Sequence, residues 1–214
     1  MKVNLPDQLL PDAQRNRRNF LGSLTLAGAG LMFGGVECLA AKKQELSREE
    51  KYPLLAAQFA AIDLKNFQRE KWKHIIGHHS ATPNGNAAIF DRYHREVRHM
   101  EYGLAYHFVI GNGTDSADGQ IEIGPRWTDQ LRGGHVKSLA WDENSIGICL
   151  VGNFEETYPT KNQIAAFIQL TGFLKRDLLA DKPTLLLHRE IPGEQTLCPG
   201  ANFPAKRIHK LFVA

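Results

Sequence analysis

Cysteine is scarce in this sequence of 214 residues, which contains only three. Two of them, Cys149 and Cys198, lie beyond the N-terminal forty residues. Two cysteines do not form the dense disulfide framework that stabilises small secreted domains, so at least one of the pair needs another explanation. A strong charge bias is also missing, because 26 Lys and Arg against 23 Asp and Glu leave a formal net charge of +3. This balance argues against nucleic acid as a partner.

A long apolar run is absent as well. The nearest approach is Gly22–Val36, where every residue is apolar, glycine, serine or threonine. A membrane-spanning helix needs about 20 predominantly apolar residues, so this glycine-rich stretch is too short to span comfortably. A basic segment that ends in Arg17-Arg18-Asn19-Phe20-Leu21 precedes it, which is the layout of a signal peptide. We therefore predict that residues 1–40 are an export signal and that the protein acts in the periplasm or cell envelope.

The arginine pair followed by Phe20 and Leu21 resembles a twin-arginine signal, which exports folded proteins. Small residues place the predicted cleavage after Ala40 or Ala41, and after cleavage we expect no stable membrane insertion. An uncleaved amphipathic anchor is the alternative. Lipid attachment at Cys38 is disfavoured, because the preceding residue is a glutamate where a small residue is normally required.

The composition changes again after the signal. Residues 41–71 are rich in Lys, Glu and Gln around the apolar stretch Leu54–Ile62. Ser47 and Glu50 have the spacing of a capping box, which predicts the start of a helix. We expect a helical lead-in over residues 41–71, followed by one main domain over residues 72–214.

The main domain alternates between strand and helix patterns. Apolar runs predict strands at Trp72–His79, Tyr106–Ile110, Gln120–Ile123, Ser145–Val151 and Thr184–Leu187. Apolar spacing and capping signals predict helices at Ala88–Met100, Thr160–Leu179 and Pro204–Phe212. This alternation predicts an α/β fold, a single domain with a central mixed β-sheet packed by helices.

Three segments place metal-binding residue types near the ends of predicted strands. They are His78-His79-Ser80-Ala81-Thr82, Leu187-His188-Arg189-Glu190 and Thr196-Leu197-Cys198-Pro199-Gly200. Two imidazoles and one thiolate suit Zn²⁺, and three protein ligands leave a fourth position open for water. Adjacent side chains on a strand point to opposite faces, so only one of His78 and His79 can face the metal. The spacing alone does not choose between them.

Five motifs occur in an order that resembles a known family. They are Ile76-Gly77-His78-His79-Ser80-Ala81-Thr82, Ala105-Tyr106-His107-Phe108-Val109-Ile110, Asn144-Ser145-Ile146-Gly147-Ile148, Val151-Gly152-Asn153-Phe154, and His188-Arg189-Glu190 through Cys198-Pro199-Gly200. Together they resemble the type-2 N-acetylmuramoyl-L-alanine amidases, which include amidase-type phage lysozymes and peptidoglycan recognition proteins. The resemblance covers roughly residues 72–212. It implies one Zn²⁺ per chain and hydrolysis of the amide bond between the lactyl group of N-acetylmuramic acid and L-alanine. It also implies peptidoglycan or muropeptides as partners, and we expect a monomer.

The family pattern assigns the metal ligands residue by residue. Its first ligand is the histidine that opens the His-(His/Cys)-(Ser/Thr) segment, which corresponds to His78. The second is the histidine before Arg-Glu, His188, and the third is the cysteine before Pro-Gly, Cys198. The resemblance therefore implies that His79 points away from the metal and supports the strand.

Two further positions carry catalytic roles in the family. The tyrosine before His-Phe lies beside the catalytic water, which implies that role for Tyr106. The residue two before the third ligand is Lys in some members and Thr in others, and here it is Thr196. A threonine can donate a hydrogen bond to a developing oxyanion but brings no charge. One bacterial branch has a glutamate base on the central strand, and here Cys149 occupies that place, so we expect this cysteine to be an inert packed residue.

Two residues are expected to contact substrate or to shape its surroundings. His135 matches a family position that lines the substrate groove, although a histidine in a loop can also be an ordinary surface residue. Asn144 is a candidate substrate contact as well, with the alternative that it holds the loop before the central strand.

Two other functions are compatible with this pattern. The family contains non-catalytic peptidoglycan-binding modules, which usually lack the third ligand. A zinc peptidase that cuts within the stem peptide would retain the metal but act on another bond. The complete set His78, His188 and Cys198 favours the amidase over the binding module, and the products of digestion distinguish the amidase from the peptidase.

Overall fold

The computed structural model describes residues 46–65, 67–179 and 183–212. The chain divides into two units, residues 1–45 and 46–214, and the second unit contains all described residues. The predicted export signal lies outside them. Among the described residues, no helix has the length and apolar character required to cross a membrane.

The secondary structure follows the predicted alternation of strands and helices. The strands are β1 His74–His79, β2 Phe108–Ile110, β3 Ile121–Ile123, β4 Ser145–Leu150 and β5 Thr184–Leu187. The α-helices are α1 Arg48–Lys51, α2 Phe59–Ile62, α3 Ala87–Glu96, α4 Pro125–Thr128, α5 Leu139–Glu143, α6 Lys161–Phe173 and α7 Ala205–Phe212. Shorter helical turns are the 3₁₀ segments η2 Pro53–Gln58 and η4 His188–Glu190 and the π segment η3 Leu174–Leu178.

The five strands form one mixed sheet in the order β3-β2-β4-β1-β5. Strands β2, β4, β1 and β5 are parallel, and β3 pairs antiparallel with β2 at the edge. The central strand β4 is buried along its whole length, as expected for a parallel strand that is covered on both faces. The predicted α/β fold with a central mixed sheet is therefore confirmed.

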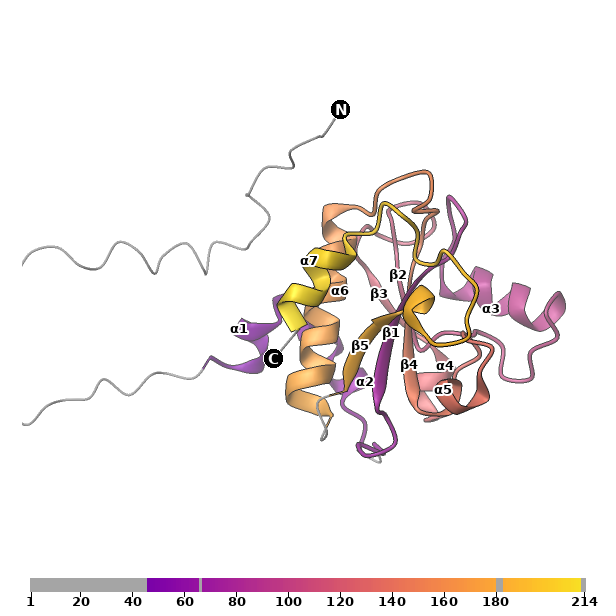
Figure 1. Ribbon diagram of the computed structural model, residues 1–214. Helices are drawn as coiled ribbons and strands as arrows, with labels where there is room; N and C mark the ends of the chain where they lie inside the picture. Colours follow the sequence, from indigo (N-terminus) through magenta and orange to yellow (C-terminus); the bar gives the residue numbers. More distant parts are fainter. Residues whose placement is uncertain (1–45, 66, 180–182, 213–214) are drawn as a thin grey trace, which may run out of the picture. The chain divides into compact units, whose positions relative to one another are not determined.

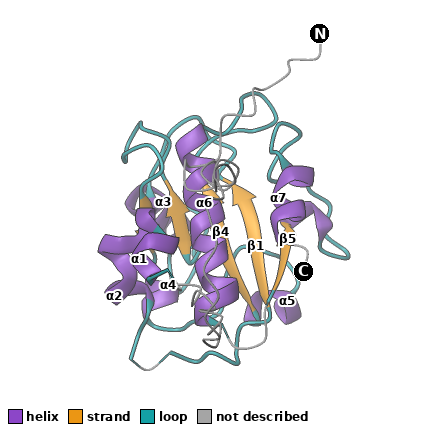
Figure 2. Cartoon of the chain, turned by 90° about the vertical axis from the view of Figure 1, so that its left-hand side faces the viewer, coloured by secondary structure: helices purple, strands orange, loops and turns teal. Residues whose placement is uncertain are grey.

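Helix α6 covers one face of the sheet. A capping box between Thr160 and Gln163 starts this helix, and its buried residues Phe167 and Leu170 pack with the apolar side chains of that face. Gly77 on β1 makes this approach possible, since a Cβ at this position would lie 3.1 Å from the Phe167 ring. Figure 2 shows α6 in front of the sheet, and Figure 1 shows α7 on the same side.

Helix α3 lies on the opposite face (Figure 1). The Asn86 side chain caps its N-terminus by accepting a hydrogen bond from the Ile89 N–H. Phe90 of this helix packs with Val109 and Cys149 in a second buried cluster. The predicted helix to Met100 ends earlier, at Glu96, because the backbone enters a left-handed conformation at His99, with φ +52°.

The lead-in helices belong to the same packed unit. Leu55 and Ile62 are completely buried in the main core cluster, and Tyr52 is nearly so. The backbone carbonyl of Ile62 also accepts a hydrogen bond from the indole N–H of Trp127, at 3.1 Å. Residues 46–65 therefore contribute part of the hydrophobic core beneath the sheet.

Candidate metal centre

The candidate metal ligands meet at the carboxyl ends of β1 and β5. Gly77 pairs with Leu187 between these parallel strands, so His78 and His188, the residues that follow, emerge next to each other. Cys198 comes from the loop between η4 and α7. The possible ligand atoms of His78, His188 and Cys198 all lie within 4.8 Å of one another. In open α/β sheets this edge is the usual place for a binding site.

One ring nitrogen of each histidine remains available for a metal. The Nδ1 of His78 lies 3.7 Å from the Cys198 sulfur, and its Nε2 lies 3.1 Å from Nδ1 of His135. The Nε2 of His188 lies 3.4 Å from a carboxylate oxygen of Glu194. In both rings, Nε2 therefore contacts a supporting residue and Nδ1 is left for coordination.

The two histidines are held in the neutral form that binds metals. Burial lowers the pKa of His78 well below its usual value, and the neighbouring His135 and His188 lower it further. Burial also lowers the pKa of His188, although Glu194 opposes this effect. A neutral imidazole keeps one ring nitrogen free as a ligand, so both side chains are prepared for a cation.

The Cys198 sulfur occupies a buried position with one backbone donor. Burial raises the pKa of this thiol to about 12, and the backbone N–H of His79, 3.4 Å from the sulfur, opposes the rise. A bound divalent cation would reverse this balance, because a coordinating thiol loses its proton. The N–H of Arg189 donates to the Cys198 carbonyl at 2.9 Å. This bond fixes to η4 the loop that carries Cys198, residues 191–204, which we call the ligand loop.

His79 lies on the opposite face of β1, as the alternation of the strand requires. Its Nδ1 accepts a hydrogen bond from the backbone N–H of Phe154 at 3.1 Å. The ring therefore joins β1 to the loop after β4, and it is His78 that lies with the other two candidate ligands.

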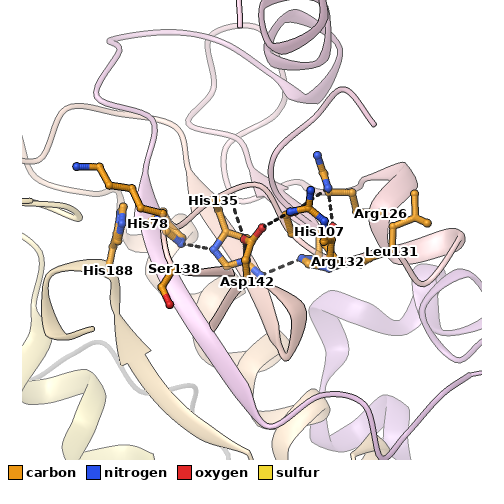
Figure 3. Close-up of polar contacts among 12 residues, drawn as sticks. His78, His107, Arg126, Leu131, Arg132, His135, Ser138, Asp142 and His188 are labelled. Carbon is orange, nitrogen blue, oxygen red and sulfur yellow. Dashed lines mark hydrogen bonds and ion pairs between the residues drawn. The ribbon is translucent and has the colours of Figure 1, made fainter. Parts of the chain in front are cut away.

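The donor set fits Zn²⁺, and the tautomers required for coordination are compatible with the surroundings. Coordination through Nδ1 of His78 requires the proton on Nε2, where Nδ1 of His135 can accept it. The proton of His135 then lies on its own Nε2, which is buried without a hydrogen-bond partner and faces an Asp142 carboxylate oxygen at 3.9 Å. Figure 3 shows His78, His135 and Asp142 in this order. In the tautomer that metal binding requires, the Nε2–H of His135 thus has an acceptor close by.

His135 is buried in this structure, and its expected place in a substrate groove stays a prediction. Its side chain is 0% exposed and fills the space above Gly147 on β4, where a Cβ would lie only 2.4 Å from the imidazole. Its backbone N–H donates to Asp142 at 3.1 Å, and Arg132 pairs with the same carboxylate at 3.2 Å. These contacts make His135 a buried support for His78.

Asn144 lies away from the candidate ligands, and its expected contact with substrate stays a prediction. It precedes Ser145, which pairs with His74 at the amino end of β1, whereas His78 lies four residues further along that strand. The Asn144 side chain donates to the Ala140 carbonyl at 3.0 Å. The alternative that it holds the loop before β4 agrees with this contact.

Tyr106 lies beside His78, the first candidate ligand. Its ring centroid is 5.3 Å from that of His78, and the residue is half-buried. Burial raises the pKa of the hydroxyl well above 10, and the neighbouring Cys149 and Cys198 raise it further. Tyr106 is therefore a neutral hydroxyl group. Cys149 is completely buried on β4, as expected for a packed residue.

Thr196 is half-exposed in the ligand loop. Its Oγ1 accepts a hydrogen bond from the backbone N–H of Cys198 at 3.1 Å. Since the oxygen acts as an acceptor in this bond, the hydroxyl proton stays free to donate to another group.

Glu194 is a residue of the site that sequence reasoning missed. It contacts His188 from within the ligand loop, but the sequence has a second glutamate nearby, Glu190, that is closer to the histidine in the chain. The only available signal was the presence of acidic residues between two candidate ligands. That signal does not distinguish Glu194, which contacts His188, from Glu190, which contacts His209.

Comparison with known proteins gives consistent matches. Residues 68–201 match a protein family described as N-acetylmuramoyl-L-alanine amidase. Peptidoglycan recognition protein 1 of Mus musculus is 29% identical over 133 residues, which cover 59% of this chain and 68% of that protein. Peptidoglycan-recognition protein 2 of Holotrichia diomphalia is 30% identical over 102 residues, 44% of this chain and 49% of that protein. The chain thus spans about half the length of the Holotrichia diomphalia relative.

Solved structures show the same fold. The N-acetylmuramoyl-L-alanine amidase LysC from Clostridium intestinale is similar with a TM-score of 0.57 and 30% sequence identity, over 68% of this chain and 89% of that chain. Human PGRP-IBETAC, solved in complex with glycosamyl muramyl pentapeptide, gives a TM-score of 0.51 at 20% identity, over 64% of this chain and 81% of that chain. At that lower identity the similarity concerns the fold alone.

Proposed function

This chain belongs to the N-acetylmuramoyl-L-alanine amidase family, and from that premise we propose that it is a Zn²⁺-dependent enzyme. Its substrate is peptidoglycan or muropeptides, and the bond it hydrolyses joins the lactyl group of N-acetylmuramic acid to L-alanine. The observation that carries the proposal is the complete donor set of His78, His188 and Cys198 within 4.8 Å. The matched relatives include peptidoglycan recognition proteins, which supports this class of substrate.

The amide bond is difficult to hydrolyse at neutral pH because water is a poor nucleophile and the leaving amine needs a proton. When bound, Zn²⁺ would lower the pKa of water and polarise the carbonyl group. His78 and His188 would hold it through their Nδ1 atoms, and Cys198 would hold it through its sulfur. The buried positions of His78 and Cys198 strengthen these interactions, because little water competes for the donors.

The chain's own hydroxyl groups contribute the remaining steps. Tyr106 is neutral and lies against the His78 ring, so its hydroxyl orients the attacking water and passes a proton toward the leaving amine. The free hydroxyl proton of Thr196 donates a hydrogen bond to the oxyanion that forms on the carbonyl.

A non-catalytic binding module is the principal alternative, since the matched relatives include recognition proteins. The complete donor set favours catalysis, because a binding surface needs no thiol beside two imidazoles. A zinc peptidase acting within the stem peptide is the second alternative, and only the identity of the products separates it from an amidase.

Digestion of purified peptidoglycan with a protein that comprises residues 41–214 tests the proposal. Mass spectrometry should detect intact stem peptides that begin with L-alanine, and elemental analysis should find about one zinc per chain. Cys198→Ser should abolish release of these peptides while circular dichroism stays unchanged, since the sheet and helices supply the core. Binding without any products would support the recognition module, and shortened peptides would support the peptidase.

We also propose that the protein acts outside the cytoplasm, in the periplasm or cell envelope, where its substrate lies. The signal-like layout of residues 1–40 supports this location. Fractionation of cells that produce the full chain tests it, and accumulation of the folded protein in the cytoplasm would contradict it.

A further inference from the structure

Glu194 joins one candidate ligand to a neighbouring loop. Its side chain is only 3% exposed. One carboxylate oxygen accepts hydrogen bonds from the backbone N–H groups of Lys137 and Ser138, at 2.7 and 3.2 Å. The other oxygen lies 3.4 Å from Nε2 of His188. Both oxygens of this buried carboxylate are thus engaged, one with the backbone and one with the imidazole.

We propose that Glu194 is a positioning residue that fixes the tautomer of His188, with the proton on Nε2 and the lone pair of Nδ1 directed at the metal. The proposal deepens the proposed function, and it rests on that function only in taking His188 as a metal ligand. Glu194 itself lies outside the ligand group His78, His188 and Cys198.

The chemistry of the carboxylate determines which tautomer it stabilises. A neutral imidazole carries one proton, on either Nδ1 or Nε2, and an ionised carboxylate can only accept hydrogen bonds. The contact with Glu194 therefore favours the proton on Nε2 of His188, which leaves Nδ1 unprotonated. Carboxylates that accept the second N–H of a ligating histidine commonly fix its orientation and raise its basicity as a ligand.

The same loop supports the other histidine as well. His135, whose Nδ1 faces Nε2 of His78, lies two residues before Lys137. The segment 135–138 thus contacts His78 through the His135 side chain and His188 through Glu194. Both candidate histidine ligands are consequently oriented by one short segment. A change at Glu194 should therefore lower the affinity for metal.

Glu194→Gln tests the tautomer directly, because glutamine has the same length but offers one acceptor and one donor group. If the amide oxygen stays with the N–H groups of Lys137 and Ser138, the NH₂ group faces Nε2 of His188 and favours the proton on Nδ1. If the amide is reversed, its NH₂ group faces two backbone N–H groups and the link to the loop is lost. Either arrangement weakens a site that needs an unprotonated, oriented Nδ1.

Glu190→Gln is the matched control. Glu190 also accepts a backbone hydrogen bond, from Leu187 at 2.8 Å, and contacts a histidine, His209, at 2.8 Å. That histidine lies outside the candidate ligand group. The control makes the same chemical change four residues away in the chain.

Two measurements on the purified protein decide the question. Nitrogen-15 NMR of the metal-free wild type should find the His188 proton on Nε2, and Glu194→Gln should shift it at least partly to Nδ1. Competition with a chromophoric chelator should show zinc affinity about 10–100-fold lower for Glu194→Gln, and within about twofold of wild type for Glu190→Gln. Circular dichroism should show that both variants are folded.

Three results would overturn the positioning role. They are a proton on Nδ1 in the metal-free wild type, unchanged zinc affinity in Glu194→Gln, and an equal loss of affinity in Glu190→Gln. Failure of the proposed function looks different, because a wild type that binds zinc without releasing stem peptides would leave the tautomer and affinity results standing.

Discussion

His107 should make the folded protein sensitive to acid in a measurable way. The side chain is completely buried, its Nε2 lies 3.1 Å from the Leu131 carbonyl, and its Nδ1 accepts a hydrogen bond from the Gly147 N–H at 3.0 Å. Burial lowers the pKa of His107 to about 3, although the bond to Leu131 opposes the shift. The folded state therefore holds this ring neutral at pH values where the unfolded chain binds a proton.

The sign and size of the effect follow from this difference. The pKa of His107 is 6.5 in the unfolded reference and about 3 in the fold. His107 therefore costs no stability above about pH 6.5, and the free energy of unfolding falls as the pH decreases toward 3. One pKa unit corresponds to about 1.36 kcal/mol. At about pH 4.5, two units below the unfolded value, His107 alone should cost about 2.7 kcal/mol of unfolding free energy.

His107→Asn isolates this contribution, because asparagine does not titrate and can still accept a hydrogen bond near the position of Nδ1. Urea unfolding at about pH 7.5 and 4.5, with chelator present, should show an acid loss about 2.7 kcal/mol smaller in the variant. Far-UV circular dichroism is the suitable probe, since the Trp72 ring lies 4.9 Å from His107 and its fluorescence would respond to the substitution. Equal acid losses in the two proteins would refute the reasoning.

Three further predictions concern the site and the export signal. His78→Ala should remove zinc and activity, whereas His79→Ala should lower thermal stability and retain zinc; elemental analysis showing the reverse would mean that the assignment is wrong by one residue. Tyr106→Phe should lower kcat by about 10²–10⁴-fold with zinc content unchanged, and a fall of less than about threefold would assign the proton transfer elsewhere. Replacing Arg17 and Arg18 together by lysine should hold the precursor inside the cell, because guanidinium and ammonium groups are not equivalent in recognition; normal export of that variant would indicate another route.

The strands could be predicted from the sequence because buried strands consist of local runs of apolar residues. Thr184–Leu187 is found within the predicted bounds, and Ser145–Leu150 differs from its prediction by one residue. His188 and Cys198 were also visible as metal-binding residue types near the ends of predicted strands. The choice of His78 over His79 depended on the resemblance to the amidase family, because the spacing alone does not choose between them.

The supports of the site depend on contacts between distant segments, which local patterns do not encode. His135 is buried only because Gly147, on another strand, leaves space for its ring. Glu194 is held in place by hydrogen bonds from the backbone N–H groups of Lys137 and Ser138, more than fifty residues earlier in the chain. The position of Asn144 also depends on a distant segment, because the parallel pairing of β4 with β1 places it at the strand ends opposite the site.

The packing of the lead-in sets a practical boundary for anyone who wishes to shorten this protein. The family match begins at residue 68, but a chain trimmed there would lose Leu55 and Ile62, both completely buried. Burial of each such side chain contributes about 1.5–3 kcal/mol, against a total of about 5–15 kcal/mol for a typical domain. Trimming would also remove the carbonyl that accepts the buried indole N–H of Trp127. A boundary chosen by homology would therefore yield a chain prone to unfolding and aggregation, and the smallest stable fragment must begin before Tyr52.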